Sequence, residues 1–229
     1  MTQQKIKYIM KKSLLIFAFV GGLLTLNSCK NDKTEAGDAQ EVATTSDDSK
    51  GYVVDTANST IEWVGSKPTG NHNGTIAISA GEVYLNNGKV ESGKFTIDMT
   101  SITVLDLAAG DGKEDLEGHL KGLGKPEDAD HFFNTNKYPE GVFEITSVNT
   151  VDGQTTIEGN LTLKEITKSV KFPATLALDG DSLMLTTETF TINRTDWNVN
   201  YGSKSIFDNL GDKFINDAIE LKISVKASK

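Results

Sequence analysis

Cysteine, histidine and arginine are scarce in this chain of 229 residues. The single cysteine, Cys29, excludes an intramolecular disulfide framework. The three histidines, His72, His119 and His131, do not recur at the three-to-five spacing of a local metal motif, and the chain has no Gly-x-Ser-x-Gly elbow of a serine hydrolase. These absences argue against most classes of enzyme, and we expect no catalytic residues, no metal and no cofactor.

Basic residues are also in the minority. Lysine and arginine number 23 against 32 aspartates and glutamates, which gives a net charge of −9 at pH 7. A surface of this charge repels the phosphates of nucleic acids and anionic lipid headgroups. We therefore expect no nucleic-acid partner and no membrane binding through a basic patch.

The N-terminus has the order of a secretory signal. Four lysines precede an apolar run at residues 14–26, and small polar residues follow the run. This order is typical of a signal peptide, and the run is shorter than the roughly 20 residues that a transmembrane helix needs. Removing residues 1–28 would leave 19 basic against 32 acidic residues, a net charge of −13.

Leu26-Asn27-Ser28-Cys29 resembles a bacterial lipobox, in which the cysteine is diacylated and becomes the mature N-terminus. We therefore predict a lipoprotein signal at residues 1–28 and an acyl anchor on Cys29 that attaches the chain to a membrane. The predicted location is the bacterial cell envelope, facing either the periplasm or the cell surface. An incidental cysteine after an ordinary signal is the alternative.

Two further segments follow. Residues 29–50 consist mainly of Asn, Asp, Glu, Thr, Ser and Ala, and Val42 is their only large aliphatic residue, which predicts a disordered tether. Residues 51–229 form the folded domain, which is long enough to bury one hydrophobic core.

Alternation of apolar and polar residues is clearest at residues 155–179. Two alternating runs flank a polar turn at residues 164–168 and predict a hairpin with one buried face, while Pro173 predicts an edge, a bend or a bulge. Shorter alternating runs follow one another from residue 52 to the C-terminus, without a βαβ unit or a repeat. The prediction is an all-β fold, a closed antiparallel barrel of about eight strands, with a β-sandwich as the second choice.

One segment breaks this pattern. Leu116, Leu120 and Leu123 are spaced by four and three residues, which predicts a short amphipathic helix across one end of the barrel. We expect one or two short helices to cover that end.

An eight-stranded barrel is just wide enough to be filled by side chains or to hold one apolar ligand. Alternation leaves both possibilities open. The predicted inward-facing residues are Ile61, Trp63, Ile76, Phe95, Ile97, Phe143, Leu161, Phe172, Phe190 and Ile219.

Arg194 is the only arginine and follows an apolar strand, with Asp196 two residues on. A guanidinium binds carboxylates and phosphates through a planar fork of donors. Arg194 is therefore expected either to pin its loop through an Arg–carboxylate pair or to contact a ligand headgroup at the pocket mouth.

Several motifs occur in a characteristic order. They are Tyr52-Val53-Val54-Asp55, Ser59-Thr60-Ile61-Glu62-Trp63, Gly118-His119-Leu120-Lys121, Phe132-Phe133 with Tyr138-Pro139, Leu161-Thr162-Leu163-Lys164 and Ile192-Asn193-Arg194-Thr195-Asp196-Trp197. This set resembles the YceI-like family of bacterial envelope proteins over residues 51–229. The resemblance implies a lipocalin-like barrel whose interior binds a long isoprenoid chain, such as a polyprenyl phosphate or a quinone tail, without catalysis.

The resemblance also places five residues near the pocket opening or its cover. They are His119, Phe132, Phe133, Arg194 and Trp197. The chain departs from the family pattern at Glu165 and Asn198, where glycine is usual. Because glutamate adopts positive φ poorly, we expect another geometry for the turn at Glu165. Residues 122–129 are longer than usual and are expected to lengthen a cover over the pocket.

Three functions follow from these observations. The first is a lipid-anchored carrier or sequestering module for an isoprenoid-type lipid. The second is a structural or interaction lipoprotein with a filled barrel, and the third is a hydrolase or metal-binding protein built on the histidines. The oligomeric state stays open.

Overall fold

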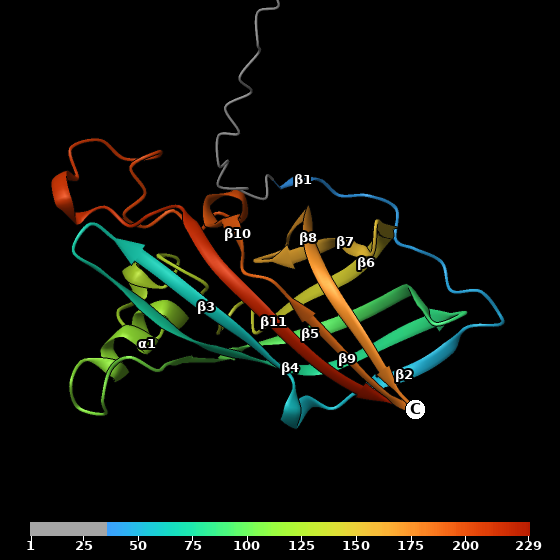
Figure 1. Cartoon of the computed structure of the whole chain (residues 1–229). Helices are drawn as coiled ribbons and strands as arrows, with labels where there is room; N and C mark the ends of the chain where they lie inside the picture. Colours follow the sequence, from blue (N-terminus) through green and yellow to red (C-terminus); the bar gives the residue numbers. More distant parts are fainter. Residues whose placement is uncertain (1–35) are drawn as a thin grey trace, which may run out of the picture. The chain divides into compact units, whose positions relative to one another are not determined.

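Strands of alternating apolar and polar residues dominate the computed structural model, which describes residues 36–229 (Figure 1). In chain order the strands are β1 (Gly37–Asp38), β2 (Lys50–Val54), β3 (Thr60–Lys67), β4 (Gly70–Asn86), β5 (Lys89–Val104), β6 (Glu140–Val151), β7 (Gln154–Leu163), β8 (Ile166–Asp179), β9 (Ser182–Thr187), β10 (Phe190–Asn193) and β11 (Ala218–Ser228). The helix is α1 (Lys113–Lys121), and the 3-10 turns are η1 (Thr56–Asn58), η2 (Pro126–Asp128), η3 (Arg194–Trp197) and η4 (Gly211–Lys213).

Eight of these strands close into a ring. Antiparallel pairing runs from β3 through β4, β5, β6, β7, β8, β9 and β11, and β11 pairs again with β3. The predicted closed antiparallel barrel of about eight strands is confirmed. Closure hides the strand edges that an open sheet would expose.

The predicted hairpin at residues 155–179 is the pair β7–β8, in which Leu163 pairs with Ile166. Its turn therefore has two residues, and both adopt positive φ, 49° at Lys164 and 62° at Glu165. These values are those of a type I′ turn, the usual connection of a two-residue hairpin. The expectation that Glu165 would avoid this geometry is wrong, because the ladder on both sides leaves only two residues to close the turn.

α1 confirms the predicted helix. Leu116 and Leu120 pack against the core, whereas Leu123 lies beyond the end of the helix and is exposed. The helix ends at Gly122, where φ is 71° and a Cβ atom would lie 2.3 Å from the carbonyl oxygen of Ala129. A glycine is required there on both counts.

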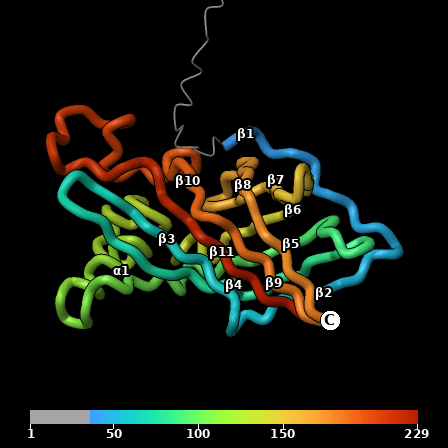
Figure 2. Tube along the Cα trace, in the orientation of Figure 1, coloured from blue at the N-terminus to red at the C-terminus, as the bar shows by residue number. Residues whose placement is uncertain are grey.

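Residues 36–49, which we call the strap, contain β1 and run along the outside of the barrel to the start of β2 (Figure 2). Gln40 and Asn160 exchange two hydrogen bonds, of 2.9 and 2.7 Å. Ala43 N–H donates to the carbonyl oxygen of Ile145 at 3.0 Å. The expected disordered tether is therefore wrong for this part of residues 29–50, because polar contacts hold the strap and apolar content does not reveal them.

The predicted signal at residues 1–28 and the acylated Cys29 lie outside the described residues. Within residues 36–229 no helix is long and apolar enough to cross a membrane.

Candidate ligand-binding cavity

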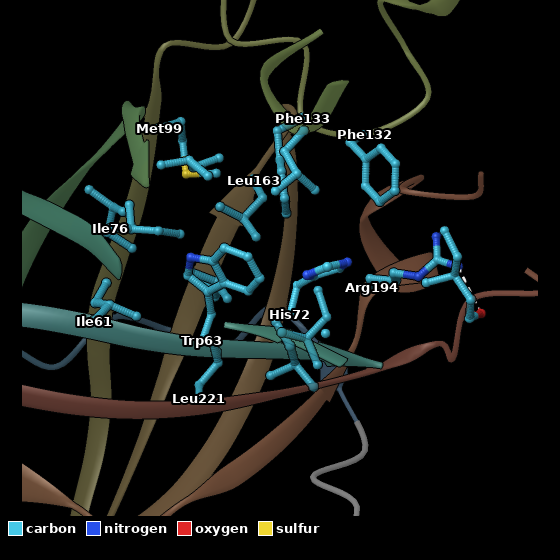
Figure 3. A pocket seen from close by; sticks show the side chains of 18 of the residues that line it. Ile61, Trp63, His72, Ile76, Met99, Phe132, Phe133, Leu163, Arg194 and Leu221 are labelled. Carbon is cyan, nitrogen blue, oxygen red and sulfur yellow. Dashed lines mark hydrogen bonds between the residues drawn. The ribbon is translucent and has the colours of Figure 1, made fainter. Parts of the chain in front are cut away.

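A cavity of about 360 Å³ occupies one half of the barrel and is lined almost wholly by apolar side chains (Figure 3). Nine of the ten predicted inward-facing residues line it: Ile61, Trp63, Ile76, Ile97, Phe143, Leu161, Phe172, Phe190 and Ile219. Phe95, the tenth, lines a separate cavity of about 40 Å³ in the other half. The described barrel is therefore not completely filled by its own side chains.

Aromatic rings form much of the cavity wall. Phe172 stacks on Phe190 with ring centroids 4.5 Å apart and contacts Phe143 at 5.6 Å. Trp63 lies over Gly74, where a Cβ atom would come within 2.6 Å of the indole ring. A larger residue at Gly74 would clash first with the carbonyl oxygen of Thr103 on β5 and then with this ring, so glycine is required for both to approach this closely.

The mouth of the cavity is covered by α1 and residues 128–135, which together we call the lid. Phe133 N–H donates to Leu120 O at 3.1 Å and Thr135 N–H to Lys121 O at 2.8 Å, so the two parts of the lid form one unit. Phe132 and Phe133 line the cavity from this side (Figure 3).

Lys164 ties the lid to the barrel. Its ammonium donates to the carbonyl oxygens of Phe132 at 2.9 Å and Asn198 at 3.2 Å, and it lies 3.7 Å from the Asp130 carboxylate. Burial lowers the pKa of Lys164, and Asp130 opposes this shift. The turn residue with positive φ thus also joins two loops at the mouth.

Arg194 lines the cavity, but its donors point into the protein (Figure 3). The guanidinium donates to three carbonyl oxygens, those of Asn216 at 3.1 Å, Val199 at 2.6 Å and Ile215 at 3.1 Å. Asp217 lies 3.5 Å away, and this carboxylate opposes the lowering of the Arg194 pKa by burial. These contacts fit the loop-pinning alternative, with main-chain carbonyls rather than a carboxylate as the principal partners.

Trp197 does not line the cavity. It is fully buried, and its indole N–H donates to the carbonyl oxygen of Leu161 at 3.0 Å. The position after it, Asn198, has φ of 56°, which asparagine tolerates. Trp197 is therefore a core residue hydrogen-bonded to β7, while the other four predicted mouth residues line the cavity.

The histidines separate into two places. His119 Nε2 and His131 Nδ1 are 3.0 Å apart within the lid, and His131 Nε2 lies 3.5 Å from Asp128. Burial and His131 lower the pKa of His119, against the opposing effect of Asp128. In the part of the chain that the structure describes, no three His, Cys, Asp or Glu side chains are arranged to hold a metal ion.

His72 lines the cavity at its mouth, and its Nδ1 lies 2.8 Å from the Asp106 carboxylate. Burial tends to raise the pKa of Asp106, but the backbone N–H of Asn73 and His72 together keep it below its ordinary value. Because Nδ1 is engaged with a carboxylate, Nε2 is the nitrogen left to accept or donate a hydrogen bond.

Comparison with known proteins agrees with this geometry. A family model for the YceI-like domain matches residues 52–227. The chain belongs to the YceI-like family. No curated protein sequence matches it closely.

Two solved structures share the fold of this YceI-like chain. BcnA of Burkholderia cenocepacia is 22% identical, with a TM-score of 0.59 over 76% of this chain and 99% of that one. A polyisoprenoid binding domain from Saccharophagus degradans is 14% identical, with a TM-score of 0.54 over 82% of this chain and 99% of that one.

Several cavity residues of the YceI-like barrel were missed by the sequence analysis. They include Met99, Ile102, Leu163, Val170, Ile192 and Tyr201, besides His72. Leu163 and Val170 continue the alternation of β7 and β8, so the pattern itself could have found them. Tyr201 comes from an irregular loop, where no periodicity exists to indicate its direction.

Proposed function

We propose that this YceI-like protein binds a long-chain isoprenoid-type lipid inside its barrel and acts as a carrier or sequestering module of the cell envelope, without catalysis. The observation that carries the proposal is the open apolar cavity of about 360 Å³, within the size range of natural ligand sites. Family membership and the fold shared with a polyisoprenoid binding domain support the ligand class.

The energetics favour an apolar chain as the ligand. Each CH₂ group moved from water into such a site contributes roughly 0.8 kcal/mol before the loss of chain entropy. The main alternative, a purely structural lipoprotein with a filled barrel, requires a barrel without this cavity.

The first test is organic extraction and native mass spectrometry of the chain purified from a bacterial envelope. We expect a co-purifying isoprenoid in stoichiometric amount. Phe190→Asp places a charge in the cavity and is expected to abolish this binding, whereas Val53→Asp, at a position 61% exposed, is the matched control.

Because Phe190→Asp also threatens folding, Ile219→Trp provides a second variant that fills the cavity without adding charge. Circular dichroism checks that each variant is folded. Wild-type protein that carries no lipid and takes up no added polyprenol would disprove the proposed function.

The lipid anchor is a separate part of the proposal. We propose that Cys29 is acylated and attaches the protein to an envelope membrane, on the strength of the lipobox resemblance. Metabolic labelling with an alkyne fatty acid should label the wild-type chain and not Cys29→Ser. Equal labelling of the two would refute the anchor without affecting the cavity.

A further inference from the structure

The barrel wall beside the large cavity has a place where the backbone ladder is interrupted. Over residues 166–173, β8 pairs with β7 on one side. On its other side, its only strand partners among the described residues are Gly37 and Asp38 of β1. β9 joins this edge of β8 only from Ala174 onward.

β10 follows β9 in the chain and occupies the corresponding part of the wall. Within the described structure it pairs with β11 and with no other strand. A seam therefore separates residues 166–173 of β8 from β10, next to the large cavity. Pro173 ends this stretch of β8, as expected of a residue that cannot donate a ladder hydrogen bond.

Side chains close the seam from within. Val170 and Phe172 on β8 and Phe190 and Ile192 on β10 all line the cavity. Phe172 and Phe190 stack across the seam at an interplanar angle of 19°. Between β7 and β8 and between β10 and β11, on either side of the seam, ladder hydrogen bonds as well as side chains hold the strands together. Opening the seam breaks mainly apolar contacts, and the tail of an entering lipid can replace these.

The strap covers the seam from outside with few interactions. β1 is two residues long, Ala36 before it packs against the core, and the Asp38 side chain forms an exposed pair with Lys168 at 3.6 Å. Such exposed pairs contribute little to stability. The Gln40–Asn160 hydrogen bonds are the strongest fastening near the seam.

The mouth is closed more firmly than the seam. Lys164 donates to the carbonyl oxygens of Asp130 and Phe132 in the lid, and Tyr201 N–H donates to that of His131. The Glu117 carboxylate of α1 also accepts from Val104 N–H on β5 at 2.8 Å. Moving the lid therefore leaves several carbonyl oxygens without donors, which is costly in a buried site.

We propose that the seam between β8 and β10 is the portal through which the lipid enters and leaves the cavity, and that residues 36–40 of the strap are its removable cover. This portal rests on the proposed lipid-binding function. It predicts that the exchange rate depends on release of the strap, whereas the equilibrium affinity does not.

A disulfide tests the portal directly. A Cβ atom on Gly37 would lie 3.8 Å from the Cβ atom of Ser169, the usual spacing in a disulfide. The variant Gly37→Cys/Ser169→Cys is made in the whole chain with Cys29→Ser, so that the engineered pair is the only one. Oxidation should slow transfer of a fluorescent geranylgeranyl probe from phosphatidylcholine vesicles by about tenfold or more, and a reductant should restore the rate.

The matched control pins the strap far from the seam. Thr45 Oγ1 and Ser92 Oγ are 2.6 Å apart, so Thr45→Cys/Ser92→Cys can form a disulfide there. Oxidation of this control should leave the exchange rate unchanged. Unchanged exchange in the oxidised Gly37→Cys/Ser169→Cys protein would overturn the portal and leave the mouth as the route.

A second variant covers the case in which the seam disulfide does not form. Asn160→Ala removes both hydrogen bonds to Gln40 and is expected to speed exchange by about tenfold. An unchanged rate in this variant would equally reject the strap as the cover. Wild-type protein that binds no probe would instead contradict the proposed function.

Discussion

The two halves of the barrel are built from the same strands but differ in how completely side chains fill them. In the half away from the lid, Ile145, Ile157, Leu185 and Val225 enclose a void of only about 40 Å³. In the half beneath the lid, the strands surround about 360 Å³ and the wall has a seam. Tight packing in the half away from the lid supplies much of the stability of the core, which leaves the other half open for a ligand.

In the open half, polar contacts hold the loops in place, and we expect those of Arg194 to contribute most to stability. Arg194→Leu should lower the free energy of unfolding by about 5 kcal/mol, because three carbonyl oxygens lose their donor in a buried site. Urea denaturation measures the change, with Arg194→Lys as the intermediate control. A loss below about 1 kcal/mol would show that Arg194 does not pin the loop.

Truncating one isoleucine in each half compares their packing. Ile145→Ala should cost about 4 kcal/mol, because it opens a void in a packed core. Ile192→Ala should cost only about 2 kcal/mol, because Ile192 already borders the large cavity. Equal losses in thermal or urea unfolding would contradict the division into a packed and an open half.

The turn between β7 and β8 carries strain that can be removed. Glu165 has φ of 62°, and a side chain in this region costs about 1 kcal/mol relative to glycine. Glu165→Gly should therefore raise the free energy of unfolding by that amount. Glu158→Gly, on an extended strand, should destabilise instead, and a loss of stability in both variants would refute the strain.

The smallest expected change in stability comes from contacts between the strap and Glu91 at the packed half. Hydroxyl groups of Ser46 and Ser49 and the backbone N–H of Ser46 hold the pKa of Glu91 at about 2, against an ordinary 4.5. A lowered pKa in the folded state stabilises the protein above pH 4.5, and this contribution is lost as the pH falls toward 2.

An NMR titration of Glu91 measures this pKa. Ser46→Ala/Ser49→Ala should move it back toward its ordinary value, whereas Asp38→Asn, at the seam end of the strap, should not. An ordinary pKa in the wild-type protein would mean that the strap is not held at this end.

Many residues of the cavity wall could be predicted from the sequence, but the sequence did not show whether the interior is open or filled. Alternation placed Leu161, Phe172 and Phe190 on the inner face because side chains of a strand alternate with a period of two. Whether the interior is open depends on the sum of many side-chain volumes and on how the barrel is sheared. No local pattern contains that information.

The strap and Arg194 show the same limit for polar contacts. Val42 is the only large apolar residue among residues 36–49, and their polar partners are Asn160, Ser92 and Glu91, far along the chain. Arg194 finds its partners among carbonyl oxygens of residues 199–216, which every amino acid possesses. Amino-acid composition cannot identify such partners, because they become neighbours only when the chain folds.

Periodicity and ordered motifs are properties of the chain, so the amino-acid sequence was enough to predict most of the strands, the closed antiparallel barrel, the helix α1 and the family. The hollow half, the seam in the wall and the strap over the seam could be seen only in the three-dimensional structure. Those features arise from the register of strands distant in sequence and from the volume left between them. Both are set only when the ring of strands closes.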